Sequence, residues 1–209
     1  MKKYYLSLCL LLAIGTASAY ANRGIGEATR TTDPGVVIDG VRWATRNVDA
    51  PGTFAQNPES AGVFYQWNCR RAWSATGEVS DWNTSTPQGI IWEKTNDPCP
   101  PGWRVPTFDE LRRLAHSANV ISRSVEINGI NGKAFEDETS GNTLFLPAVG
   151  WRSNDGALGS AGVGGHYWSS TPAAGTSARN LSFYSASFTS LGVSISTRAF
   201  GFSVRCVAK

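Results

Sequence analysis

The residues that most clearly suggest a binding chemistry are tryptophans set among polar side chains. Residues 74–100 are rich in Thr, Ser, Asn and Pro and show no apolar period, and Trp73 and Trp82 lie at or within this stretch. A loop of this length in a compact domain usually carries function or is ordered by its own side chains. An indole face packs against sugar C–H groups, while amides, carboxylates and guanidinium groups bind hydroxyls. We therefore expect a site for carbohydrate or a surface protein that includes Trp73, Asp81, Trp82, Asn83, Arg152, His166 and Tyr167.

Large aromatic side chains also build hydrophobic cores, and this structural reading applies to most of the eight tryptophans. We expect Trp43, Trp103, Trp151 and Trp168 to be core residues. For Trp82 the two readings stay equal, because its ring could equally bind a ligand or hold the long loop in place.

No arrangement of residues indicates catalysis or metal binding. His116 and His166 are the only histidines, and neither has an obvious Ser or Cys partner in the sequence. Carboxylates are numerous, but their spacing singles out no pair for glycoside cleavage. The acidic run 136–138 is most simply a solvated turn, although calcium could use such oxygens. We therefore expect a protein that is not an enzyme and that needs no metal or cofactor.

The first residues have the order of a secretory signal peptide. Two lysines precede an apolar run, which ends in small residues, and the rule for cleavage sites fits Ala19 or Ala21. We place the signal at residues 1–21, expect a secreted, periplasmic or cell-surface protein, and find no second apolar stretch long enough to span a membrane. Removing Lys2 and Lys3 lowers Lys+Arg from 19 to 17 against 16 Asp+Glu, a net charge near +1. Such a balance argues against nucleic acid as a partner.

Three cysteines follow the signal, so an oxidising compartment predicts one disulfide and one free thiol. We favour a bridge between Cys99 and Cys206, because closing a loop on the order of 100 residues would contribute about 4 to 5 kcal/mol in the chain-entropy model. Pairing of Cys69 with either of the others stays open at this point.

The order of elements predicts one α+β domain. Residues 22–35 are polar and read as a flexible leader, and residues 36–209 as the domain. Residues 36–44 predict a β-hairpin around an Asp-Gly turn. A capping box at Thr107 and Glu110 begins a helix that runs to about Ala118. Short strands follow at 143–149, 166–170, 181–188 and 201–207, with turns at Asn-Gly pairs 128–129 and 131–132.

Five blocks of the sequence carry a resemblance to a known family: VRWATRN at 41–47, DPCPPGWRVPT at 97–107, LPAVGWR at 146–152, YWSS at 167–170 and FSVRCV at 202–207. Together they resemble the Fibrobacter succinogenes major paralogous domain, a family of exported bacterial proteins, over residues 38–208. That family is similar in turn to the C-type lectin-like fold, with short antiparallel strands, one or two helices and long ordered loops. The resemblance implies that the first and last strands pair and that the Cys before the helix bridges to the last strand, which Cys99 and Cys206 fit.

The resemblance leaves three functions to consider. The first is a non-enzymatic module that binds carbohydrate or a surface protein. The second is a structural subunit of a surface appendage or envelope complex, in which the leader pairs with a neighbour. The third is an enzyme of the formylglycine-generating type, which would need a reactive cysteine pair and therefore a thiol close to Cys69.

Overall fold

The computed structural model describes residues 30–185 and 191–209, so the expected signal peptide and most of the expected leader lie outside the described residues. The last residues of that leader contact the domain. The amide of Phe54 donates to the carbonyl of Arg30, and the carboxylate of Asp33 accepts hydrogen bonds from the amide of Thr45 and from Nε of Arg46. The segment 30–35 is therefore held against the domain.

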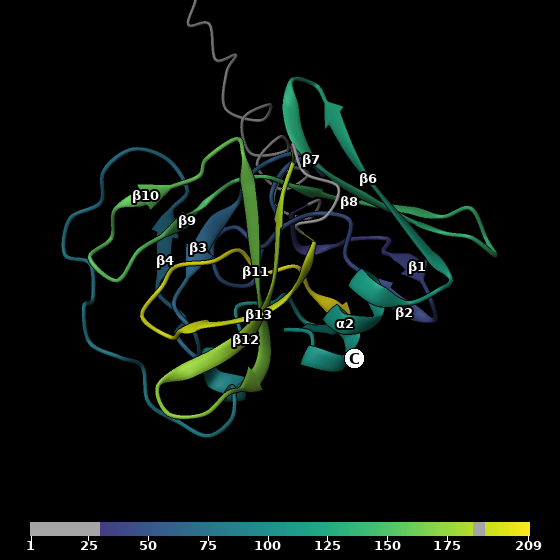
Figure 1. Ribbon diagram of the computed structural model, residues 1–209. Helices are drawn as coiled ribbons and strands as arrows, with labels where there is room; N and C mark the ends of the chain where they lie inside the picture. Colours follow the sequence, from purple (N-terminus) through teal and green to yellow (C-terminus); the bar gives the residue numbers. More distant parts are fainter. Residues whose placement is uncertain (1–29, 186–190) are drawn as a thin grey trace, which may run out of the picture.

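The described chain is mostly antiparallel β-sheet with one α-helix (Figure 1). A four-stranded sheet has the order β1 (Val36–Ile38), β2 (Val41–Trp43), β14 (Val207–Ala208), β5 (Trp103–Arg104). A second sheet consists of β6 (Val120–Ile127), β7 (Ile130–Asp137) and β8 (Thr143–Pro147), and a third of β11 (Gly164–Pro172), β12 (Ser177–Tyr184) and β13 (Gly192–Thr197). Two short ribbons pair β3 (Val63–Tyr65) with β4 (Ala72–Ser74) and β9 (Trp151–Arg152) with β10 (Leu158–Gly159).

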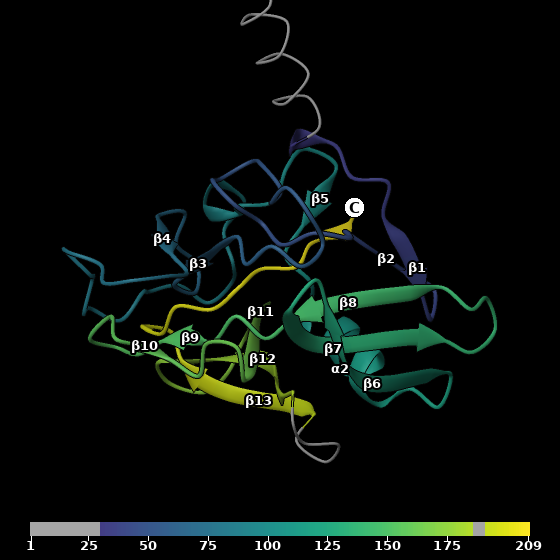
Figure 2. The same cartoon turned by 90° about the horizontal axis from the view of Figure 1, so that it is seen from above.

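The two views show where these units lie. In both, the β6–β7–β8 sheet is at one side of the molecule and the ribbons β3–β4 and β9–β10 are at the other, with β11 and β12 between them (Figure 2). The long loop after β4 runs on the side of the two ribbons and ends in a 3-10 helix, η1 (Lys94–Asn96). The expected loop is thus present, on the far side of the molecule from β6.

The opening hairpin and the helix form as predicted. Asp39 and Gly40 adopt positive φ angles of 46° and 74°, which a two-residue turn between β1 and β2 needs. The helix α2 (Phe108–His116) begins with the full capping box of Thr107 and Glu110. Its residues Leu111 and Leu114 are buried in the main core together with side chains of β7, β8 and β12.

Residues 120–137 differ from the sequence prediction. They form one hairpin of two eight-residue strands, turned at Asn128 and Gly129 as expected. The second Asn-Gly pair is not a turn, because Gly132 is a strand residue paired with Pro147. A Cβ on Gly132 would lie 2.4 Å from the carbonyl oxygen of Leu146, so the glycine permits close approach of β8. The acidic run is a solvated turn only at Glu138, because Asp137 is buried at the end of β7, where its carboxylate accepts a hydrogen bond from the amide of Asp39.

No helix within residues 30–185 and 191–209 has both the length and the apolar character needed to cross a membrane.

Candidate functional site

Three of the residues expected to bind ligand lie together, beside the start of the long loop. The rings of Trp73 and Trp82 have centroids 4.7 Å apart, and Nε1 of Trp82 donates to the carbonyl of Asn154. Arg152 is only 1% exposed, and its guanidinium donates to four backbone carbonyls, those of Ser74, Thr76, Gly77 and Gly156. Trp73 is also buried. This cluster fastens the loop to the β9–β10 ribbon.

Asp81 and Asn83 flank Trp82 on the surface of the loop. Both are exposed. Asp81 has a positive φ of 57°, and Asn83 uses its side-chain oxygen to accept from the amide and hydroxyl of Ser85. They are close to the cluster because they are its neighbours along the chain.

His166 and Tyr167 lie in β11, where they contact a different set of side chains. Tyr167 is fully buried, stacks on Phe183 and donates its hydroxyl to the carbonyl of Pro147. His166 lies against the rings of Trp151 and Phe202, and neither imidazole nitrogen has a partner among the described residues. Burial lowers the pKa of His166 to about 4. A ligand-binding role for the seven residues stays a prediction, and burial favours a structural role for Trp73, Arg152 and Tyr167.

The four tryptophans expected in the core fall into two groups. Trp43, Trp103 and Trp168 are buried, with exposed fractions of 1%, 9% and 0%. Trp151 is only partly buried and packs on the edge of the second cluster, next to Phe200.

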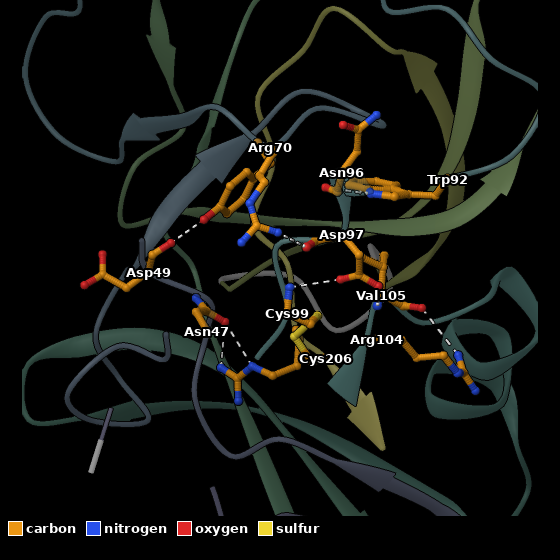
Figure 3. The surroundings of a disulfide bond; sticks show 12 residues. Asn47, Asp49, Arg70, Trp92, Asn96, Asp97, Cys99, Arg104, Val105 and Cys206 are labelled. Carbon is orange, nitrogen blue, oxygen red and sulfur yellow. Dashed lines mark hydrogen bonds between the residues drawn. A yellow bond between two sulfur atoms is a disulfide. The ribbon is translucent and has the colours of Figure 1, made fainter. Parts of the chain in front are cut away.

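The disulfide joins Cys99 to Cys206, as predicted, across a sequence separation of 107 residues. Cys206 is the residue directly before β14, and Cys99 precedes β5 and α2 in the chain. Cys69 is free, and burial raises the pKa of its thiol. The bridge therefore fixes the C-terminal strand to the segment that leads into the helix (Figure 3).

A groove with a volume of about 790 Å³ opens beside this disulfide. Its walls come from five separate parts of the chain: Gly52, Arg70, the stretch 92–107 that includes η1 and β5, Ser170 in β11, and Lys209 after β14. The lining residues are Gly52, Arg70, Trp92, Lys94, Asp97, Cys99, Pro100, Pro101, Trp103, Arg104, Val105, Thr107, Ser170 and Lys209. The volume is in the range typical of small-molecule sites.

Two indole rings stiffen the groove wall. Trp92 packs edge-to-face on Trp67 and donates Nε1–H to the carbonyl of Asn96, and Trp103 packs edge-to-face on Phe54. Because both rings are fixed by core contacts, the part of each that reaches the groove keeps its position without a ligand. Such a preformed wall lowers the ordering cost of binding.

Asp97 organises the floor of the groove. Its carboxylate accepts hydrogen bonds from the backbone amides of Cys99, at 2.9 Å, and Val105, at 3.3 Å. Its backbone carbonyl accepts a hydrogen bond from Nη1 of Arg70 at 2.8 Å (Figure 3). Burial raises the pKa of Asp97, while these backbone amides act in the opposite direction. The residue thereby holds the disulfide segment, β5 and Arg70 in one arrangement.

Four cationic side chains line the groove, and one of them is neutralised. Arg104 forms a two-pronged ion pair with Glu110 at 2.8 and 2.6 Å, and this hydrogen bonding raises the pKa of Arg104. Across the described parts of the chain, Arg70, Lys94 and Lys209 form no ion pair with a carboxylate. The groove therefore combines fixed apolar walls with more positive than negative charge, since the carboxylate of Asp97 is close enough to interact with Lys209.

Sequence reasoning pointed to the loop 74–100 but not to this groove. Trp92 and Lys94 come from that loop, whereas Ser170 joins them through the hydrogen bond of its amide to the carbonyl of Pro106, and Lys209 joins them because β14 pairs with β5. The pairing of Cys99 with Cys206 was the one signal in the sequence that could have located it. Among residues 30–185 and 191–209, no group of three or more His, Cys, Asp or Glu side chains could hold a metal ion.

Comparison with known proteins identifies the family. The family model described as the Fibrobacter succinogenes major domain matches residues 36–208, which is most of the chain. No curated protein and no solved structure matches this chain. The chain therefore belongs to the Fibrobacter succinogenes major domain family.

Proposed function

We propose that this protein is an exported, non-enzymatic binding module that recognises carbohydrate through the groove beside the disulfide. The observation that carries the proposal is the groove itself. It pairs the fixed indoles Trp92 and Trp103 with the hydroxyl of Ser170 and with cationic side chains. Each indole leaves 9% of its residue exposed, and this small apolar surface next to polar groups suits the two kinds of surface that a sugar presents.

Export is supported by two independent features. The N-terminal residues have the order of a signal peptide, and the chain contains a disulfide, which persists in oxidising compartments. We place the protein in the periplasm, at the cell surface or outside the cell.

A C-type lectin-like architecture is part of the proposal. It is supported by the pairing of Val207 in the last strand with Trp43 in the opening hairpin. The bridge from the residue before β14 to the segment before α2 agrees with it as well.

The state of the cysteines favours binding over catalysis. Cys99 and Cys206 are consumed by their bond, and the remaining described cysteine, Cys69, has a pKa raised by burial. A nucleophilic cysteine needs the opposite, a lowered pKa that yields thiolate. These features do not fit the reactive thiol pair of a formylglycine-generating enzyme.

A glycan array probed with the mature chain tests the proposal. We expect binding that is lost in Ser170→Tyr, because a phenol ring at this half-buried position would occupy the groove. Asp81→Ala and Asn83→Ala, on the loop surface near Trp82, serve as controls and should bind as the wild type does. Near-UV circular dichroism checks that each variant folds.

Two results would count against the proposal. Loss of binding in Asp81→Ala with normal binding by Ser170→Tyr would move the site to the Trp82 loop. Absence of glycan binding, together with self-association in light scattering, would favour the structural subunit instead.

A further inference from the structure

We infer that the groove beside the disulfide selects acidic saccharides, in which carboxylate or sulfate groups bind Arg70 and Lys94. This inference rests on the proposed carbohydrate binding and adds the chemical class of the ligand. Its support is the distribution of charge inside the groove, which differs from that of the chain as a whole.

The charge in the groove is positive although the chain is nearly neutral. Without the two lysines of the signal, the chain carries 17 Lys+Arg and 16 Asp+Glu. With Arg104 set aside because Glu110 pairs with it, the groove is lined by three cationic side chains and the carboxylate of Asp97. A concentration of one sign of charge in a hollow attracts and orients ligands of the opposite sign.

Asp97 does not cancel this charge by direct pairing. Its two carboxylate oxygens accept the backbone amides of Cys99 and Val105. Arg70 instead donates to the carbonyl oxygen of Asp97, which fixes the guanidinium and satisfies one of its five N–H donors. Within residues 30–185 and 191–209 the Arg70 side chain donates no other hydrogen bond, so its remaining N–H donors are available to a ligand.

Lys94 lies across the same groove on η1, at a position that the rest of the fold holds in place. The 3-10 turn is closed by the amide of Asn96 donating to Glu93, and the side chain of Asn68 accepts from the amide of Glu93. Neither contact involves the ammonium group of Lys94. A planar guanidinium and a flexible ammonium that share one groove suit two acidic groups on one ligand.

The walls favour a saccharide over a simple anion. The indoles of Trp92 and Trp103 and the rings of Pro100 and Pro101 are part of the lining, and a small inorganic anion would gain nothing from them. An acidic sugar uses both parts, because its ring C–H groups face the apolar wall while its charged group reaches the cations. Two ligand chemistries meet this description, carboxylated sugars and sulfated sugars.

Isothermal titration of the full mature chain with matched ligands tests the inference. The ligands are tetragalacturonate, its methyl ester, a sulfated glucose tetramer and hexaglutamate. We expect tetragalacturonate or the sulfated tetramer to bind at least about tenfold more tightly than the uncharged ester, and more weakly as salt increases. Whichever of these two acidic ligands binds more tightly identifies carboxylate or sulfate as the recognised group.

A pair of adjacent arginines supplies the matched control. Arg70→Gln should weaken binding of the acidic ligand about tenfold, as should Lys94→Gln. Arg71→Gln removes the same charge one residue along the chain, but this guanidinium lies over the ring of Trp73 at 4.0 Å, so binding should change less than about twofold.

The outcomes separate this inference from the proposed function. Equal affinity for tetragalacturonate and its ester would overturn the acidic selection and leave carbohydrate binding standing. Binding of hexaglutamate as tight as that of the sugar would overturn the saccharide assignment. No binding of any sugar would overturn both.

Discussion

Removing the disulfide should cost this domain a large part of its stability. The double variant Cys99→Ala/Cys206→Ala frees a loop closed over 107 residues. In the chain-entropy model a loop of this length contributes about 4.7 kcal/mol, because the crosslink restricts the unfolded chain. Net stabilities of domains are about 5–15 kcal/mol, so the variant should be close to unfolding at 37 °C.

Urea unfolding followed by tryptophan fluorescence and far-UV circular dichroism measures the effect. Wild type, the double variant and Cys69→Ala are compared at equal protein concentration. Cys69→Ala keeps the bridge and removes only a half-buried thiol, so its free energy of unfolding should lie within about 1 kcal/mol of wild type. The double variant should lose about 4 to 5 kcal/mol.

Two results would refute this reasoning. A loss below about 1 kcal/mol in the double variant would show that the bridge does not hold the C-terminal strand in the way the loop length implies. A large loss in Cys69→Ala with none in the double variant would show that a different cysteine pair is bonded.

Three further variants test how the fold is held together. Burial lowers the pKa of His166 in the folded protein to about 4, below the value of about 6.5 in the unfolded chain. The free energy of unfolding should therefore fall by up to about 3 kcal/mol as the pH is lowered from 6.5 to 4. His166→Phe should abolish this fall in urea titrations. Thr107→Ala removes the side-chain acceptor of the helix cap and should cost about 1 kcal/mol of unfolding free energy in the same assay. Arg152→Ala leaves four carbonyls without their donor and should cost about 3 kcal/mol, with faster amide exchange in residues 74–77.

The parts of the fold that could be predicted are those with strong local signals. The Asp-Gly turn fixes β1 and β2 because both residues must tolerate positive φ, and the capping box fixes the start of α2. The disulfide followed from the compartment, the loop length and the family resemblance together.

The hairpin at 120–137 was not predicted because its signals depend on tertiary contacts. Gly132 has the sequence appearance of a turn residue, but its missing side chain serves close packing against β8. Asp137 has the appearance of a surface residue, but it is buried because it accepts the amide of Asp39 from a distant hairpin. Neither partner is visible within a local window of sequence.

In the candidate site, too, the residue types could be recognised from the sequence but their tertiary contacts could not. Trp73, Trp82 and Arg152 do lie near one another, yet Arg152 is directed at backbone carbonyls rather than at the surface. The groove residues escaped notice because segments near residues 94, 103, 170 and 209 meet only in the folded chain.

The central claim is that ligands bind in the groove beside the disulfide, and indole N–H resonances in a ¹H–¹⁵N spectrum test it most directly. With tetragalacturonate added to isotopically labelled protein, we predict shifts in the indole signals of Trp92 and Trp103 and in the backbone amide of Lys94, with the Trp82 signal unchanged. Shifts concentrated at Trp82 and the backbone amides of Asp81 and Asn83, with Trp92 and Trp103 unaffected, would contradict the claim.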